Sequence, residues 1–283
     1  MSIEVVGEIE QMRAVCERLR REGRVIGLVP TMGALHEGHL SLVGIAREHA
    51  DTVVVSIYLN PAQFAPGEDF EKYPRMLGKD VQLLSTAGAD YVFTPNDKMM
   101  YPKGYATHVI VSGLTDGLCG RSRPAHFRGV TTVVAKLFNI VRPHVAVFGE
   151  KDAQQLAVIR RMTRDLDFGI EIIGAPIVRE ANGLAMSSRN EYLSAEERSQ
   201  ASVLSRSLAE AAKLAASSEA RAAEIVQAVR TVIRQSPLAE VEYIELVDTE
   251  TLQPVSMIAD AALLALAVRF GKTRLIDNVI LKR

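Results

Sequence analysis

Cysteine is scarce in this sequence of 283 residues, which contains only Cys16 and Cys119. The two lie far apart and neither belongs to a CxxC pair, so neither a disulfide framework nor a zinc cluster is indicated. Charge of one sign is also lacking, because 33 Lys and Arg residues nearly cancel 34 Asp and Glu residues. A general nucleic-acid binder would carry a basic excess. We therefore expect a cytoplasmic protein with no nucleic-acid partner.

Long hydrophobic runs are missing as well. No apolar stretch approaches the ~20 residues that span a bilayer. Glu4, Glu8 and Glu10 stand where a secretory signal would need a basic start and an apolar run. We expect no membrane partner. The chain is long enough for about two domains, and its 48% of hydrophobic residues can supply a buried core.

The first part of the chain alternates between strand-like and helix-like segments. Residues 25–30 and 52–59 are rich in β-branched residues, as strands buried on both faces are. Residues 40–50 between them have helical periodicity, so the three segments predict a parallel, right-handed βαβ unit. The alternation continues with helices near 73–88, 128–141 and 152–165 and with strands near 91–93, 107–111, 145–148 and 170–174. This pattern predicts an α/β fold with a doubly wound parallel sheet.

The pattern changes after residue 176. Residues 194–235 have helical periodicity, broken into two helices at Ser217 and Ser218, and Pro237 ends the second. Strands are expected at 241–248, 262–268 and 274–281. Helices followed by strands predict a second, smaller α+β domain. We place the two domains at residues 1–176 and 177–283.

His36 and His39 stand at the turn into the first predicted helix of the sheet domain. Their spacing can direct both imidazoles to one spot beside a helix N-terminus, where free N–H groups and the helix dipole favour phosphate. Gly38 between them lets a phosphate approach the backbone. Two ordinary histidines near a turn are the plain alternative, and a metal site is a third, although no further ligand is nearby.

A second polar cluster, Gly149-Glu150-Lys151-Asp152, follows the predicted strand at 145–148. Lys151 can reach a phosphate, and Asp152 can hold Mg²⁺ or a ribose hydroxyl. The alternative is a solvated helix start, where acidic residues are common. Gln154 and Gln155 follow, and an inward-facing amide can bind both a carboxylate and a hydroxyl.

The loop Met186-Ser187-Ser188-Arg189-Asn190 lies at the predicted domain junction. Two hydroxyls and a guanidinium suit a mobile phosphate clamp, and a helix-capping loop is the alternative.

Two other features carry no function in our interpretation. Gly271-Lys272-Thr273 is not a P-loop, because the earlier glycine position holds Leu266. Cys119 has no paired base in any motif, so we interpret it as structural or incidental.

Taken together, these motifs resemble the pantothenate synthetase (pantoate–β-alanine ligase) family of the HxGH nucleotidylyltransferase superfamily. The resemblance rests on seven ordered segments, namely residues 30–39, 60–64, 73–75, 123–130, 148–152, 186–190 and 273–278. Two departures concern Ala62, where the family commonly has Met, and Lys79, where it has an acidic residue. The first departure makes the apolar surface at position 62 smaller. The second leaves Asp80 or Asp152 as the candidate Mg²⁺ ligands.

The resemblance implies a Rossmann-like N-terminal domain that binds ATP and pantoate, a C-terminal lid domain, and a homodimer. It also implies the ATP-binding residues Met32, Gly33, Ala34, Leu35, His36, Glu37, Gly38, His39, Gly149, Glu150, Lys151, Asp152, Val178, Met186, Ser187, Ser188 and Arg189. Among these, His39 matches the position usually assigned as proton donor, and the others expected to act in catalysis are His36, Lys151, Ser187, Ser188 and Arg189. Gln63 and Gln155 are implied to hold pantoate, and Asn60, Tyr73 and Arg123 are further candidates for substrate binding.

The activity implied is the ATP- and Mg²⁺-dependent condensation of pantoate with β-alanine through a pantoyl adenylate. Transfer of AMP gives the carboxylate a good leaving group, so no covalent enzyme intermediate is needed. Two other classes stay open, a nucleotidyltransferase whose acceptor is a phosphate and a non-catalytic ATP-binding or tRNA-interacting module. The glutamines, in place of a second basic pocket, disfavour the first. The near-zero net charge and the lack of an anticodon-binding extension disfavour the tRNA-interacting module.

Overall fold

The computed structural model describes residues 3–217 and 221–283. The chain forms two compact units. Unit 1 comprises the chain up to Val111 together with Arg123–Glu150 and Val158–Pro176. Unit 2 comprises Ser112–Ser122, Lys151–Ala157 and Ile177–Arg283. Two short segments that precede residue 176 therefore group with the C-terminal part of the chain.

Unit 1 contains a six-stranded sheet in the order β1-β4-β3-β2-β5-β6, in which every neighbouring pair is parallel. The strands are β1 (Glu4–Val6), β2 (Ile26–Thr31), β3 (Thr52–Ile57), β4 (Tyr91–Phe93), β5 (Val145–Gly149) and β6 (Glu171–Ala175). β2 and β3 are buried almost throughout, which is why they consist of apolar and β-branched runs without alternation. The predicted doubly wound parallel sheet is confirmed.

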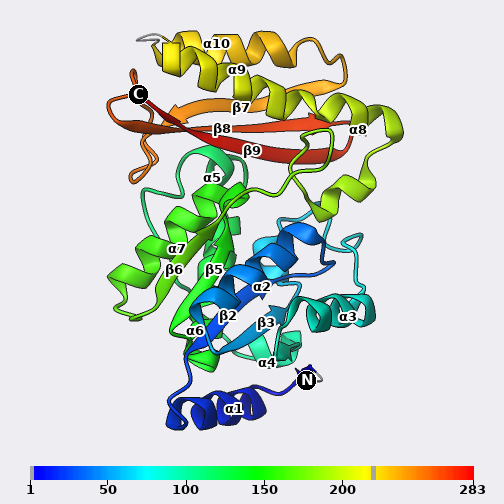
Figure 1. Cartoon of the computed structure of the whole chain (residues 1–283), viewed down its shortest axis with the longest axis vertical. Coiled ribbons are helices and arrows are strands. Elements are labelled where there is room, and N and C mark those ends of the chain that lie inside the picture. Colours follow the sequence, from blue (N-terminus) through cyan, green and yellow to red (C-terminus); the bar gives the residue numbers. More distant parts are fainter. Residues whose placement is uncertain (1–2, 218–220) are drawn as a thin grey trace. The chain divides into compact units, whose positions relative to one another are not determined.

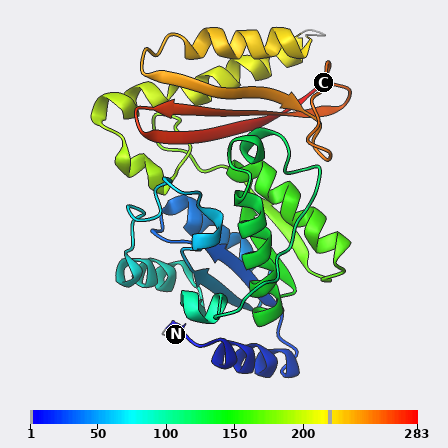
Figure 2. The same cartoon turned by 180° about the vertical axis from the view of Figure 1, so that it is seen from behind.

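Helices cover both faces of this sheet. The helices of unit 1 are α1 (Ile9–Arg21), α2 (Glu37–His49), α3 (Leu77–Ala87), α4 (Asp97–Met100), α6 (His126–Val141) and, in part, α7 (Ala153–Asp165). Figure 1 shows α2 in front of β2 and β3, and α6 is in front when the molecule is seen from behind in Figure 2. Apolar side chains of α2 and α3 pack with those of β2 and β3 in one core cluster.

The strand order determines where the candidate site residues of unit 1 lie. β2 is hydrogen-bonded to β3 on one side and to β5 on the other. The carboxyl ends of these parallel strands therefore meet at one edge of the sheet. Residues 32–39 follow β2, residues 60–63 follow β3, and Glu150 follows β5. The chain reverses its direction of winding between β2 and β5, and ligands bind at such a switch point in open α/β sheets.

The strand predicted at 107–111 is wrong, because this segment is irregular. Its backbone polar groups are satisfied by threonines of α6 instead of by a neighbouring strand. The amide of Val109 donates to Thr132 Oγ1 at 3.1 Å, and its carbonyl accepts from Thr131 Oγ1 at 2.6 Å. An apolar, β-branched run is therefore not enough to make a strand when side chains of a helix supply the hydrogen bonds.

Unit 2 contains an antiparallel sheet of β7 (Ala239–Val247), β8 (Ala261–Phe270) and β9 (Thr273–Lys282). Its helices are α5 (Leu118–Ser122), α8 (Ala195–Ala201), α9 (Val203–Ser217) and α10 (Ala222–Ile233). The helices α9 and α10 lie on one face of this sheet (Figure 1) and share an apolar core with it. The predicted helix before Ser217 is in fact two helices, since α8 ends before Ser202; Ser218 itself lies outside the described residues.

None of the helices in the described part of the chain is long and apolar enough to cross a membrane.

Candidate functional site

His36 and His39 lie at the beginning of α2, as predicted. His36 is the N-cap residue, and its backbone N–H donates to His39 Nδ1 at 3.3 Å. His39 thereby completes the helix start in the way that a Glu or Gln at the third helical position usually does. The two ring centroids are 4.0 Å apart. Because Nδ1 of His39 accepts a hydrogen bond, a neutral His39 ring carries its proton on Nε2, where it can be donated to an anion.

The loop before these histidines, from Met32 to Leu35, is supported by Asp80 from the first turn of α3. Asp80 is 1% exposed, and its Oδ1 accepts from the Leu35 amide at 2.8 Å. Burial raises the pKa of Asp80, and the Leu35 hydrogen bond and the charge of Lys79 oppose this rise. Within residues 3–217 and 221–283, no group of three or more His, Cys, Asp or Glu side chains could hold a metal ion.

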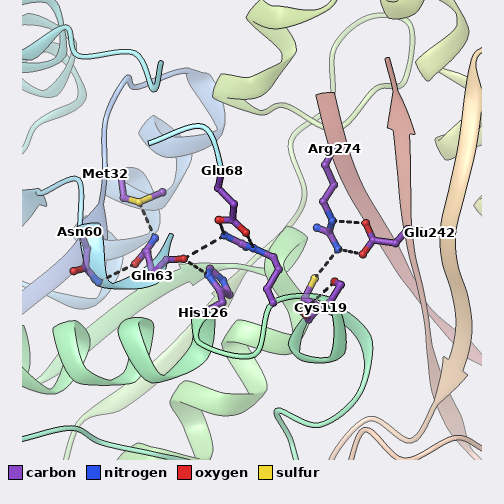
Figure 3. Close-up of polar contacts among 10 residues, drawn as sticks. Met32, Asn60, Gln63, Glu68, Cys119, His126, Glu242 and Arg274 are labelled. Atoms are coloured by element: carbon purple, nitrogen blue, oxygen red, sulfur yellow. Dashed lines mark hydrogen bonds and ion pairs between the residues drawn. The ribbon is translucent and has the colours of Figure 1, made fainter. Parts of the chain in front are cut away.

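Gln63 stands at the centre of a cluster of polar contacts in unit 1 (Figure 3). It ends the short 3₁₀ helix η1 (Pro61–Gln63), which Asn60 caps by accepting from the Ala62 amide. Gln63 Nε2 donates to Met32 Sδ at 2.8 Å, and Gln63 Oε1 accepts from Asn60 Nδ2 at 3.2 Å. The structure thus brings the predicted pantoate-binding amide into contact with the first residue of the predicted ATP-binding loop.

Asn60 is buried and its amide is occupied by protein groups. Besides Gln63, its Nδ2 donates to the carbonyl of Gly129 at 3.1 Å, and its Oδ1 accepts from Tyr101 Oη at 2.8 Å. Burial raises the pKa of Tyr101, so this hydroxyl remains a hydrogen-bond donor. These contacts suit Asn60 to orienting Gln63. Its predicted direct contact with substrate stays a prediction.

Arg123, another predicted substrate-binding residue, makes a bidentate ion pair with Glu68. Its Nε and Nη2 lie 2.7 and 2.6 Å from the two carboxylate oxygens. Burial alone would raise the pKa of Glu68, but the hydrogen bonds and charge of Arg123 outweigh it and lower the pKa. Arg123 Nη2 and His126 Nδ1 also donate to the backbone carbonyl of Gln63, at 3.3 and 2.9 Å. Arg123 and His126 therefore restrain the backbone that carries Gln63.

Tyr73 is buried, and its ring packs edge-on against Phe64, the residue after Gln63, with centroids 6.0 Å apart. This places Tyr73 beside the Gln63 segment. Sequence reasoning gave no role to Glu68, Tyr101 or His126, which also support this segment. His126 lies within a quoted motif, whereas Glu68 and Tyr101 lie in none, so spatial proximity alone identifies them.

Gly129 of α6 allows η1 to lie against this helix. A Cβ at this position would be 2.6 Å from the Gln63 amide nitrogen and closer still to the carbonyl oxygen of Ala62. We expect Gly129→Ala to lower the free energy of unfolding by about 1–3 kcal/mol, the usual cost of overpacking. Urea unfolding measures this change.

Gly44 of α2 is the matched control, because a Cβ there meets no atom within 4 Å. Gly44→Ala should stabilise the protein by up to about 1 kcal/mol through helix propensity. A Gly129→Ala variant as stable as the wild type would show that η1 and α6 can separate at little cost.

In unit 2, Lys151 and Asp152 lie in the 3₁₀ helix η2 (Glu150–Asp152) and line a pocket together with Gln155. Lys151 Nζ is 3.2 Å from Asp152 Oδ2, and the side chains are 22% and 43% exposed. Asn278 of β9 also lines the pocket, and its Nδ2 donates to the Lys151 carbonyl at 2.9 Å. The quoted 273–278 motif contained Asn278 without a role, and this contact supplies one.

The side-chain amide of Gln154 is occupied by protein groups. Gln154 Nε2 donates to the carbonyls of Leu114 and Gly117, each at 2.9 Å, and Gln154 Oε1 accepts from the Cys119 amide at 2.9 Å. Gln154 therefore holds the start of α5 and the segment before it. Both glutamines line the pocket, and Gln155 stays the predicted pantoate ligand.

Cys119 is buried among polar partners of unit 2 (Figure 3). Its Sγ lies 3.2 Å from Tyr243 Oη and 3.5 Å from Arg274 Nη2, and Arg274 makes a bidentate pair with Glu242. Burial, with a smaller effect of Cys119, raises the pKa of Tyr243. This arrangement agrees with a structural thiol.

The remaining predicted ATP-binding residues of unit 2 come together in one hairpin and the turn that follows it. The Met186 amide donates to the Val178 carbonyl at 2.9 Å, and Arg179 and Ala185 form an isolated antiparallel β-bridge. Arg179 forms a bidentate pair with the buried Asp277, at 2.7 and 3.0 Å, which attaches the hairpin to β9.

Ser187, Ser188 and Arg189 follow at the start of the 3₁₀ helix η3 (Ser188–Tyr192). Ser187 caps it by accepting from the Arg189 amide at 3.3 Å. Asn190 Nδ2 donates to Glu180 Oε1 at 2.8 Å and to the Ala185 carbonyl at 3.1 Å. The capping-loop interpretation is thus supported for Ser187, and it does not contradict the phosphate clamp, because a hydroxyl that accepts one hydrogen bond can still donate another.

A family model described as Pantoate-beta-alanine ligase matches residues 4–280. Among curated proteins, the pantothenate synthetase of Heliobacterium modesticaldum is 57% identical over 278 residues, which cover 98% of this chain and 99% of that protein. The pantothenate synthetase of Acetivibrio thermocellus is 55% identical with the same coverage.

Solved structures show the same similarity. The crystal structure of pantothenate synthetase from Thermus thermophilus is 46% identical, covers 98% of this chain and 99% of its own, and superimposes with a TM-score of 0.93. The pantoate-beta-alanine ligase of Francisella tularensis, complexed with beta-gamma ATP and beta-alanine, is 32% identical, covers 98% and 97%, and has a TM-score of 0.79.

Proposed function

This chain belongs to the pantoate-beta-alanine ligase family, and on that premise we propose that it joins pantoate to β-alanine with ATP, releasing pantothenate, AMP and pyrophosphate. Other HxGH proteins share the nucleotide loop that contains His36 and His39. Residues outside this loop must therefore decide which group receives AMP from ATP.

One observation carries this proposal, the 2.8 Å contact between Gln63 Nε2 and Met32 Sδ. Carboxylate activation requires the acid and the α-phosphate of ATP to lie side by side. An amide that can bind a carboxylate here touches the first residue of the loop that leads to His36 and His39. A nucleotidyltransferase with a phosphate acceptor would need cationic groups that are available to that phosphate, whereas the guanidinium of Arg123 beside Gln63 is paired with Glu68.

In the first step, the pantoate carboxylate attacks the α-phosphorus of ATP, the bond to the bridging oxygen breaks, and pyrophosphate leaves. Negative charge grows on the departing phosphates. We propose that this charge is stabilised by His36, His39, Lys151, Ser187, Ser188 and Arg189. His39 would donate the proton on its Nε2. The hydrogen bond from the His36 amide to His39 Nδ1 keeps this proton on Nε2.

In the second step, the neutral amine of β-alanine attacks the carbonyl carbon of pantoyl adenylate. The bond to the phosphate oxygen breaks, AMP leaves, and the amine loses a proton. Gln63 and Gln155 are proposed to hold pantoate through both steps. Exclusion of water protects the adenylate from hydrolysis.

Mg²⁺ is part of the proposal as the ion that accompanies the phosphates of ATP. Nucleotide-bound Mg²⁺ is usually held by one or two carboxylates, phosphate oxygens and water. The half-exposed carboxylate of Asp152 fits this role, whereas Asp80 is buried. When bound, the ion would neutralise phosphate charge.

We expect the protein to catalyse pantoate-dependent exchange of labelled pyrophosphate into ATP when β-alanine is absent. The reason is that the adenylate forms before the amine is needed. Exchange is measured with labelled pyrophosphate, and omission of pantoate is the control. Pantothenate formation without any exchange would contradict a freely reversible first step.

The same reaction mixtures distinguish the alternative functions. With ATP, Mg²⁺, pantoate and β-alanine, a ligase yields AMP together with pantothenate. A nucleotidyltransferase would keep AMP in its product, and a non-catalytic module would release none. The roles of residues 1–176 in substrate binding and of 177–283 as a lid stay predictions, as do the homodimer and the cytoplasmic location.

A further inference from the structure

A buried carboxyl group lies under the predicted nucleotide loop. Asp80 stands in the first turn of α3, far from the loop in sequence, and its Oδ1 accepts from the Leu35 amide at 2.8 Å. Its Oδ2 is also buried and has no hydrogen-bond partner among the residues that the structure describes. A buried oxygen without a partner is costly, so the position of this carboxyl needs a reason.

The loop backbone fits closely against that second oxygen. Gly33 has a φ of +67°, which favours glycine, and a Cβ built there would lie 2.7 Å from Asp80 Oδ2. Asp80 therefore meets the loop at two residues, through a hydrogen bond to Leu35 and through packing against Gly33. Both contacts lie shortly before His36, the N-cap of α2.

These contacts determine the path of the chain into α2. Without an acceptor at Asp80, the Leu35 amide would be left buried and unpaired, and the loop would rearrange to satisfy it. A displacement of about 1 Å in a substrate-positioning group can cost about 10²-fold in rate. The carboxyl of Asp80 is thus placed to control the geometry of the histidine pair without touching a substrate itself.

We propose that Asp80 is a positioning residue for ATP, acting as the hydrogen-bond acceptor that holds the 33–39 loop in its binding conformation. This inference rests on the proposed function. It assigns Asp80 a role in the loop rather than in the Mg²⁺ shell, and the two roles differ in what an asparagine can replace. Asn offers the same acceptor to Leu35 but is a far poorer ligand for Mg²⁺ than a carboxylate.

The test compares Asp80→Ala and Asp80→Asn by calorimetry with a non-hydrolysable ATP analogue and, separately, with pantoate. We expect Asp80→Ala to raise the Kd for the analogue about tenfold or more and to leave the Kd for pantoate within about threefold. Asp80→Asn should keep both Kd values within about threefold of the wild type. Its half-saturating Mg²⁺ concentration in the pantothenate assay should also be unchanged.

Asp90 provides the matched control. Its Oδ2 also accepts a backbone hydrogen bond, from the Val53 amide at 2.8 Å, but at the amino end of β3. Asp90→Ala should lower the melting temperature and leave the Kd for the ATP analogue within about threefold. An equal loss of ATP binding in Asp90→Ala would show general destabilisation and overturn the inference.

Four further outcomes are decisive. Unchanged ATP binding in Asp80→Ala, or a raised Mg²⁺ requirement in Asp80→Asn, would overturn the positioning role. If Asp80→Ala does not fold, Asp80→Asn carries the test, and a tenfold loss of ATP binding in that variant would overturn the inference. A wild-type protein that binds neither ATP nor pantoate would instead overturn the proposed function.

Discussion

Replacing His39 by alanine is expected to slow pantoyl-adenylate formation by about 10²–10³-fold, the effect of losing one preorganised donor to developing charge. His39 Nδ1 is occupied by the His36 amide, so the ring presents its proton at Nε2. Single-turnover adenylation with ATP and pantoate measures the rate.

Two variants separate the chemistry of His39 from its role in the helix start. His39→Gln keeps an acceptor for the N-cap amide, because Gln suits the third helical position, yet it lacks the imidazole. It should be as slow as His39→Ala but more stable to heat. His49→Ala, at the exposed end of the same helix, should keep the wild-type rate. A wild-type rate of adenylation in His39→Ala would contradict a catalytic role and favour the alternative that His36 and His39 are ordinary histidines near a turn.

Replacing Lys151 by alanine is expected to have an effect of similar size, about 10²–10³-fold on adenylation. The ammonium lies just before α7 in a pocket that also contains Asp152 and Gln155, and Asn278 holds the backbone of Lys151 in place. We expect the ammonium to meet charge that grows on the phosphates. Single-turnover adenylation is again the measurement.

The control for Lys151 is Lys213, which is likewise paired with a nearby acid, Glu210, at 2.7 Å, but is 72% exposed on α9. Lys213→Ala should leave adenylation unchanged. Lys151→Met keeps the apolar stem without the charge and should be as slow as Lys151→Ala. A fast Lys151→Met variant would show that packing, and not charge, accounts for any loss in Lys151→Ala.

Local sequence patterns predicted the parts of the fold that local physics controls. β2 and β3 are apolar runs because both faces of a parallel sheet are buried, and their identification was correct. The segment 107–111 has a similar pattern but is irregular. Its hydrogen bonds go to Thr131 and Thr132, and no pattern within 107–111 reveals that partner.

Among the candidate site residues, too, some features were predicted from local sequence and others depend on tertiary contacts. The position of His36 and His39 between a predicted strand and a predicted helix gave their place at a helix start, and their spacing predicted that both imidazoles can meet at one spot. Gln154 and Gln155 are adjacent and chemically identical in the sequence. Both line the pocket of unit 2, and only the folded chain shows that the side-chain amide of Gln154 is hydrogen-bonded to the Leu114–Cys119 segment.

By itself, the sequence determined the parallel α/β sheet, the strands of the C-terminal sheet and the order of the motifs that identify the family, because these depend on periodicity and on neighbours along the chain. The tertiary structure alone decided the partners of Gln63, Arg123 and Asp80. These contacts join residues that are 31 to 60 positions apart. Such pairs form only when strand order and helix packing bring distant segments together, and no local property of either residue specifies them.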